Sequence, residues 1–196
     1  MNSQALPNIL YLHGFRSSPQ SWKARLFAEE MVRRGLGSHF FCPDLSHDPQ
    51  QAIAQAEAII AHGPCTLVGS SLGGYYATHL AERFGARAVL VNPTTRPYDD
   101  LAAWRGVQTN LYTGEAFEVT DAHFAELRAL AVPRITRPER YFLLVETGDE
   151  VLDYRLAVAF YGGAWQYVRG GGDHSFQDFA AQVPAILRFA GVDASA

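Results

Sequence analysis

The sequence has few of the residues that would signal a disulfide framework or a nucleic-acid surface. Its 196 residues include only two cysteines, Cys42 and Cys65, and both fall in short apolar runs. This placement predicts reduced, unreactive thiols in buried strands. With 16 Lys and Arg against 20 Asp and Glu, the formal charge is -4. The chain therefore lacks the basic stripe of a nucleic-acid-binding protein.

Long apolar runs are also missing. No stretch of about 18 apolar residues occurs, which disfavours a membrane span. The N-terminus lacks a charged region followed by an apolar stretch, which is the pattern of a secretory signal. We therefore expect a cytoplasmic protein. Hydrophobic residues nevertheless make up 48% of the chain, enough to bury a continuous core. The length favours a single domain over residues 1–196.

What the sequence does contain is a regular alternation of short apolar segments and helical patterns. We predict strands at residues 8–12, 39–42, 65–68, 86–91, 140–145 and 165–168. Helical patterns accompany them at residues 21–34, 49–60, 72–84, 122–130, 153–160 and 176–189. Strands that are apolar throughout have no side that faces water. The alternation therefore predicts a three-layer α/β fold, with about six mainly parallel strands and helices on both faces.

The alternation lapses over residues 94–138, a stretch too long for a plain connection in a compact domain. The helical pattern at residues 122–130, with Thr120 or Asp121 as its N-cap, indicates that this segment has structure of its own. We expect a small cap, inserted over the end of the sheet.

The strongest chemical signal is a serine between glycines where a strand meets a helix. Residues 69–73 read G-S-S-L-G and follow directly on an apolar run. The turn is so tight that Gly69 and Gly73 are needed, because side chains there would collide. It would raise the Ser71 hydroxyl above the carboxyl end of the sheet, at a helix N-terminus. We predict that Ser71 is a nucleophile; the alternative is a glycine-rich turn without chemistry.

A serine nucleophile needs a base, and in the chain order of α/β-hydrolases a histidine follows the last strand. His174 has this place, after the glycine run 170–172, which can carry an imidazole across to the serine. The alternative is an ordinary surface histidine. His13, at the end of the first predicted strand, suits bracing of a loop better than proton transfer.

The acid that orients such a base should leave the preceding strand, and Asp149 is the best placed of four candidates. Its alternative role is that of a turn former. We expect Glu146 to point from the strand end, Glu150 to face away from Asp149, and Asp153 to cap the next helix.

Charge that develops on a carbonyl oxygen needs two fixed hydrogen-bond donors. In hydrolases with this serine turn, they are the backbone N–H groups of the residue after the nucleophile and of a residue after the first core strand. These are Leu72 and Phe15, and Gly14 would let the backbone approach closely. An everyday turn is the alternative for residues 13–15.

Several motifs together resemble the YqiA-like family of small bacterial esterases in the α/β-hydrolase superfamily. They are Y-L-H-G-F at 11–15, G-S-S-L-G-G-Y-Y-A at 69–77, V-N-P at 91–93, T-G-D-E-V-L-D-Y at 147–154 and G-G-D-H-S-F at 171–176. The resemblance implies an α/β-hydrolase fold without the two leading strands of larger members. It also implies a cytoplasmic hydrolase that needs no metal or organic cofactor, with Ser71, Asp149 and His174 as its triad.

The sequence thus predicts a serine esterase that hydrolyses carboxylic esters or acyl thioesters through an acyl-enzyme on Ser71. A peptidase or acyltransferase would use the same triad, and a catalytically silent binding protein could retain the same fold. The expected partner is a small-molecule ester or thioester, with no nucleic acid. We expect a monomer or a homodimer.

Overall fold

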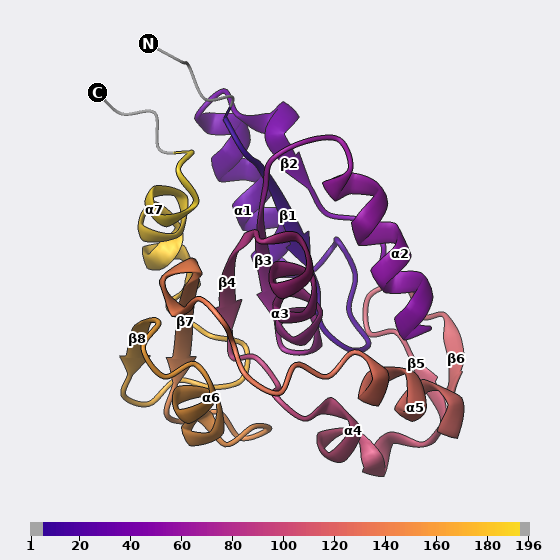
Figure 1. Ribbon diagram of the computed structural model, residues 1–196. Coiled ribbons are helices and arrows are strands. Elements are labelled where there is room, and N and C mark those ends of the chain that lie inside the picture. The colour runs from indigo at the N-terminus through magenta and orange to yellow at the C-terminus, as the bar shows by residue number, and fades with distance from the viewer. Residues whose placement is uncertain (1–5, 193–196) are drawn as a thin grey trace.

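The computed structural model describes residues 6–192, and its strands form two sheets of different kinds (Figure 1). In this part of the chain the larger sheet has six strands in the order β2-β1-β3-β4-β7-β8, and every neighbouring pair is parallel. Its strands are β1 (Asn8–Leu12), β2 (Phe40–Phe41), β3 (Cys65–Ser70), β4 (Arg87–Val91), β7 (Tyr141–Glu146) and β8 (Trp165–Arg169). The prediction of about six mainly parallel strands is confirmed.

Helices cover both faces of this sheet. One face packs against α1 (Trp22–Arg33) and α7 (Phe179–Ala190), and the other against α2 (Pro49–Ile60), α3 (Leu72–Phe84) and α6 (Tyr154–Phe160). Successive strand residues point to opposite faces, so that Leu67 and Val68 of β3 belong to different core clusters. This explains why the strands are apolar throughout and confirms the three-layer arrangement.

Helix ends follow the expected local signals. The Asp48 side chain caps α2 by accepting a hydrogen bond from the Gln51 N–H, and Pro49 occupies the first helical position, where no N–H is needed. Helix α3 ends at Gly85, whose φ of 68° is left-handed and open to glycine without strain.

Most predicted elements differ from the observed ones by one to three residues at an end, and two of these differences are informative. Strand β2 covers only Phe40–Phe41 because Gly37–His39 form a short 3-10 helix, η1. Helix α7 begins at Phe179 rather than at Phe176, which has a positive φ of 59° and closes a turn. The backbone N–H groups of Gln177 and Asp178, just before α7, instead donate to the side chain of Glu146 on β7.

The two cysteines are free, as predicted, although each is only partly buried. Burial raises the pKa of Cys42 and of Cys65 to about 12. Both thiols are therefore protonated at neutral pH, the unreactive state that the sequence predicted.

Residues 94–138, where the strand–helix alternation lapses, contain several short helices and two short strands. The elements are α4 (Pro97–Asp100), the 3-10 helix η2 (Ala102–Trp104), β5 (Gly106–Thr109), β6 (Ala116–Val119) and α5 (Asp121–Ala129); another 3-10 helix, η3 (Pro138–Arg140), leads into β7. Strands β5 and β6 form an antiparallel hairpin that was not predicted. Thr120 is the N-cap of α5, one of the two residues predicted for it. In Figure 1, α4, α5, β5 and β6 gather at the end of the molecule opposite the two termini.

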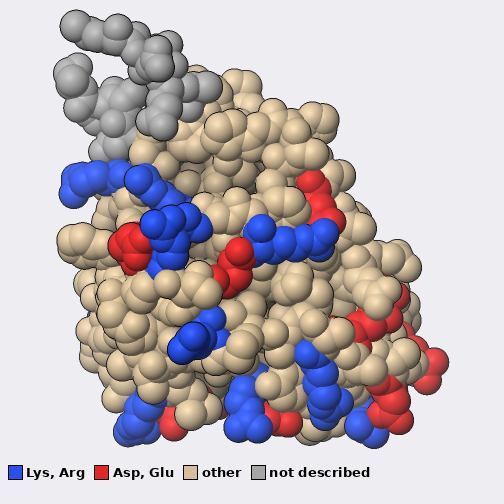
Figure 2. All heavy atoms as spheres, in the orientation of Figure 1, with Lys and Arg blue, Asp and Glu red and all other residues tan. Residues whose placement is uncertain are grey.

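The surface bears charges of both signs. Basic and acidic side chains are interspersed over the face shown in Figure 2, without a continuous patch of one sign. Among residues 6–192, no helix combines the length and the apolar character needed to cross a bilayer.

Candidate active site

The turn between β3 and α3 holds Ser71 in a strained backbone conformation. Its φ of 55° and ψ of −119° lie where a residue with a side chain is rarely found. A Cβ atom at Gly69 would lie 2.2 Å from the carbonyl oxygen of Gly73, and one at Gly73 would lie 2.0 Å from that of Leu12. Glycine is therefore required at both positions for steric reasons.

Three side chains that are far apart in the sequence meet at the carboxyl end of the sheet. His174 Nε2 lies 3.1 Å from Ser71 Oγ, and His174 Nδ1 lies 2.8 Å from Asp149 Oδ2. Because a carboxylate can only accept, the imidazole proton belongs on Nδ1, which leaves Nε2 to accept from the Ser71 hydroxyl. This arrangement can remove the hydroxyl proton as Ser71 attacks an electrophile.

Asp149 both forms a turn and contacts the imidazole. Its Oδ1 accepts hydrogen bonds from the N–H groups of Val151 and Leu152, and its side chain is 1% exposed. The side chain of His174 is 22% exposed, so one side of the imidazole faces solvent. The two roles considered for Asp149 are compatible, because the turn fixes the carboxylate that holds the ring.

The loop after β1 lies against the serine turn. A Cβ atom at Gly14 would lie 3.1 Å from Cβ of Ser71, so only glycine lets the two backbones approach this closely without displacement. Among the described residues, the Phe15 N–H has no hydrogen-bond acceptor. Leu72 is the first residue of α3, where an N–H has no partner within the helix. Both predicted donors are thus without a hydrogen-bond acceptor in the described part of the chain.

The β5–β6 hairpin is bonded to the loop that carries Phe15. Arg16 Nε donates to the Thr109 carbonyl and the Leu111 N–H to the Arg16 carbonyl, both at 2.9 Å. Asn110 Nδ2 donates to the Ser17 carbonyl, also at 2.9 Å. The Phe15 ring packs edge-on against the rings of Trp104 and Phe117. Residues 94–138 therefore help to fix the loop after β1.

Two neighbouring pockets share residues 13–17 as a wall. One, of about 230 Å³, is lined by Ser71, His174, Trp22 and Tyr112. The other, of about 260 Å³, is lined by Leu72, Tyr76, His47 and Phe117. A small molecule could therefore occupy space on either side of a carbonyl group placed at Ser71.

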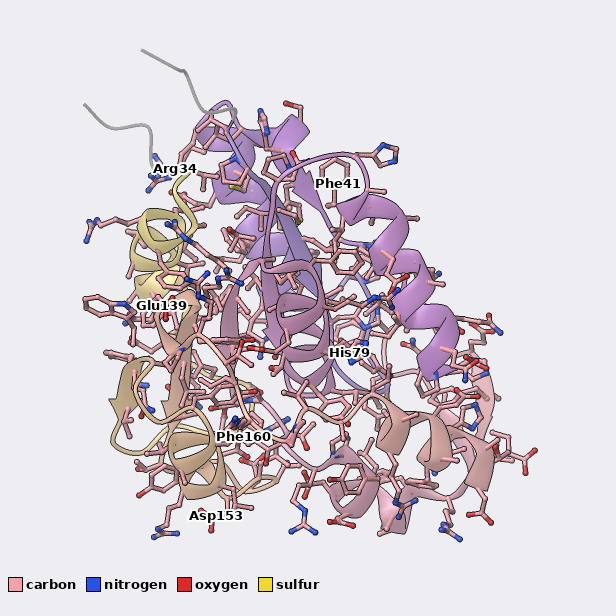
Figure 3. The ribbon with its side chains drawn as sticks, in the orientation of Figure 1. Arg34, Phe41, His79, Glu139, Asp153 and Phe160 are labelled. Atoms are coloured by element: carbon pink, nitrogen blue, oxygen red, sulfur yellow. The ribbon has the colours of Figure 1, made fainter. Side chains whose placement is uncertain are left out.

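Two other histidines, His13 and His79, have structural partners. His13 is buried; its Nε2 accepts from the Leu45 N–H at 3.0 Å, and its Nδ1 contacts the Gly14 carbonyl at 3.1 Å. Burial lowers its pKa, so the ring is neutral at physiological pH and braces two loops, as predicted. His79, on α3, contacts the Leu130 carbonyl through Nδ1 (Figure 3).

The acidic residues around Asp149 have different environments. Asp153 caps α6 by accepting from the Arg155 N–H, as predicted (Figure 3). Glu150 accepts from the His174 N–H. Glu146 differs from the expectation: instead of pointing from the strand end it is 0% exposed, because residues 170–178 fold over it. No local signal identifies this position, since its partners lie more than twenty residues away.

Lys23 is another residue that sequence reasoning missed. It is buried on α1, and its Nζ donates to the Ser175 carbonyl at 2.8 Å. Burial lowers the pKa of Lys23 to about 8, against the influence of the nearby carboxylates of Asp173, Asp149 and Glu146. Within residues 6–192, no group of three or more His, Cys, Asp or Glu side chains is arranged to hold a metal ion.

Solved structures establish the class of fold. Alpha/beta hydrolase domain-containing protein 10 from mouse superposes with a TM-score of 0.70 at 18% identity, over 96% of this chain and 92% of that one. Est1E from Butyrivibrio proteoclasticus, solved with ferulic acid, superposes with a TM-score of 0.67 at 15% identity, over 93% and 87%. The chain has the α/β-hydrolase fold.

Within that class, the chain belongs to the uncharacterised protein family UPF0227, whose family model matches residues 8–191. This is the YqiA-like family that the motifs predicted. A curated relative, the pimeloyl-[acyl-carrier protein] methyl ester esterase of Vibrio atlanticus (strain LGP32), is 27% identical over 147 residues. The match covers 65% of this chain and 55% of that enzyme, so this chain spans about half of its relative's length.

Proposed function

We propose that this protein is a serine esterase that hydrolyses carboxylic esters or acyl thioesters through a covalent acyl-enzyme on Ser71. The observation that carries the proposal is the unbroken hydrogen-bonded chain from Ser71 Oγ through the His174 ring to Asp149. A hydroxyl aligned with a base, itself aligned with a carboxylate, is the arrangement that activates serine for acyl transfer.

In the first half of the reaction, Ser71 Oγ forms a bond to the ester carbonyl carbon while its proton passes to His174 Nε2. The carbonyl oxygen becomes negative and accepts hydrogen bonds from the N–H groups of Phe15 and Leu72. His174 then gives the proton to the leaving alcohol or thiol as the bond from the carbonyl carbon breaks. A water molecule then attacks the carbonyl carbon of the acyl-enzyme while His174 takes its proton. The bond to Ser71 Oγ breaks, the proton returns to Ser71 from His174, and the acid is released.

The pockets support a small substrate. Each has a volume of about 230 to 260 Å³, near or below the lower end of the usual range for small-molecule sites. The methyl ester esterase relative supports ester chemistry for this chain. We carry over the type of bond cleaved and not the particular acyl group, because the alignment covers only part of either protein.

A fluorophosphonate probe tests the proposal, since it reacts covalently with activated serines. We expect one adduct per chain, located at Ser71 by peptide mass spectrometry and lost in Ser71→Ala. Ser38→Ala is the matched control, because Ser38 lies in η1 and contributes nothing to the site. Folded protein that takes up no adduct would instead favour a binding protein on a hydrolase fold.

A second experiment compares three substrates that carry the same acyl group as an ester, a thioester or an amide. It distinguishes an esterase from a peptidase or an acyltransferase. The proposal expects turnover of the ester or the thioester and no useful turnover of the amide. Efficient amide hydrolysis would make the protein a peptidase, and acyl transfer to an added alcohol in preference to water would make it an acyltransferase.

A further inference from the structure

The loop that carries His174 has little rigidity of its own. Residues 170–172 are three consecutive glycines, and Gly171 and Gly172 have φ values of 74° and 75°. Glycine loses more conformational freedom on folding than any other residue. The imidazole must nevertheless reach Ser71 and Asp149 at the same time, so contacts from outside the loop have to hold it.

The carboxylate of Glu146, at the end of β7, supplies three of these contacts. Its Oε2 accepts hydrogen bonds from the Asp173 N–H at 2.9 Å and the Gln177 N–H at 3.1 Å. Its Oε1 accepts from the Asp178 N–H at 3.3 Å and from Arg169 Nη1 at 2.6 Å. One buried carboxylate thus binds the backbone on both sides of His174.

The fit around this carboxylate is close. A Cβ atom at Gly172 would lie 2.0 Å from Glu146 Oε2, so the loop passes directly over the two oxygens. A carboxylate with no solvent exposure is costly to bury unless donors compensate its charge. Here the compensating donors are three N–H groups of the loop and one guanidinium.

Two further side chains bind the carbonyl groups of the same loop. Asn92, at the end of β4, donates from Nδ2 to the carbonyls of Asp173 and His174 at 3.0 and 3.2 Å. Its Oδ1 accepts from the Glu146 N–H at 3.0 Å, which ties the two anchoring residues together. Lys23 binds the next carbonyl, that of Ser175.

We infer that Glu146 is a positioning residue for the reaction: its buried carboxylate holds the loop of residues 173–178 so that the His174 ring contacts Ser71 and Asp149 together. The inference rests on the proposed function, because it assigns Glu146 a role in keeping that triad assembled. A neutral amide cannot take over this role. One of its two polar atoms is an NH2 group, which would face N–H donors and leave them without an acceptor.

The test compares Glu146→Gln with Glu82→Gln. Glu82 is a suitable control because its partly buried carboxylate also accepts several hydrogen bonds, from the N–H and hydroxyl of Thr136 and the hydroxyl of Tyr141, none of them at the triad. Both substitutions are expected to lower the melting temperature. Only Glu146→Gln should lower kcat of the folded protein, by about 100-fold, because small errors in the position of a reacting group have effects of this size.

The KM of an ester substrate should change by less than about threefold in Glu146→Gln, since Glu146 lines neither pocket. The downfield proton NMR signal of His174 Nδ1–H should weaken or move in this variant and stay unchanged in Glu82→Gln. If kcat and this signal are the same in both variants while the unaltered protein labels at Ser71, the inference is wrong and the proposed function stands. If the unaltered protein neither labels nor turns over esters, the proposed function itself is wrong.

Amide hydrogen exchange on the unaltered protein provides a measurement that does not depend on a variant that folds. The N–H groups of Asp173, Gln177 and Asp178 should exchange at least about 100-fold more slowly than in an unstructured peptide, although they lie before α7. Exchange at the unstructured rate would overturn the inference, because the carboxylate would then not be holding the loop.

Discussion

The serine turn and the histidine loop reach the same site by different physical means. At Ser71 the geometry comes from backbone sterics: a positive φ, and glycines at 69 and 73 where a Cβ atom would clash with backbone atoms of the turn itself and of β1. At His174 the local sequence permits many conformations, and distant side chains select one of them. The base therefore depends on Glu146, Asn92 and Lys23, which come from three other elements.

The serine turn and the histidine loop should therefore respond differently to substitutions. A steric requirement fails abruptly, because an added atom has nowhere to go. A loop held by several hydrogen bonds should weaken in steps, because each bond contributes on the order of 1 kcal/mol and the others remain. Substitutions in the two regions should therefore differ in how strongly and how abruptly they act.

The largest effect is expected for Gly73→Ala. The new Cβ atom would lie 2.0 Å from the Leu12 carbonyl oxygen, a backbone atom that cannot rotate away. We expect destabilisation of about 3 kcal/mol or more, measured by urea unfolding, and a fluorophosphonate labelling rate at least about 100-fold lower. Gly170→Ala is the control, since no atom lies within 4 Å of its added Cβ. Equal behaviour of the two variants would mean that the turn is not sterically determined.

A smaller, pH-dependent effect is expected at Lys23. Burial lowers its pKa from 10.5 to about 8, so between these values the unfolded chain binds more protons than the native state. The contribution of Lys23 to the free energy of unfolding must then rise with pH. Between about pH 7 and pH 10, the unaltered protein should gain about 2 kcal/mol relative to Lys23→Met. Chemical unfolding of both proteins measures this difference, and a constant difference would contradict the burial of a charged ammonium.

The smallest effect is expected where the hairpin meets the loop after β1. Asn110→Ala removes the hydrogen bond that Nδ2 donates to the Ser17 carbonyl and the two that Oδ1 accepts from the N–H groups of Tyr112 and Thr113. It should cost about 1 kcal/mol, with a labelling rate only a few-fold lower. Asn8→Ala is the control, because Asn8 also bonds through its side chain, to His39, at the opposite end of β1. If both variants label equally fast, the hairpin does not help to position Phe15.

The sequence was sufficient to predict the layers of the fold, because apolar strands with helices between them have few arrangements that bury them. Helix α2 has the predicted bounds, since Pro49 and the residues after Ile60 mark its ends. The hairpin in residues 94–138 was not predicted. Its strands have four residues each, and Val107 is 74% exposed, so no apolar alternation marks them. Short exposed strands are stabilised by their neighbours, which one sequence does not reveal.

The residues of the candidate site likewise include some that the sequence predicts and some that it does not. Ser71, Asp149 and His174 were predictable as a set because each follows a strand of a parallel sheet, and the carboxyl ends of such strands meet at one edge. Glu146 was not, because a strand-end glutamate that points outward and one that anchors a loop have the same local sequence. The start of α7 was misplaced for a related reason: the N–H groups of residues 177 and 178 bond to Glu146.

We propose that Ser71, His174 and Asp149 act together on an ester. The most direct measurement is rapid quenching during turnover of an activated ester, followed by mass spectrometry of the protein. We expect a mass increase of one acyl group on the peptide that contains Ser71, with accumulation lost in Ser71→Ala and strongly slowed in His174→Ala. Ester turnover with no acyl group on Ser71, or with the group on another residue, would contradict it.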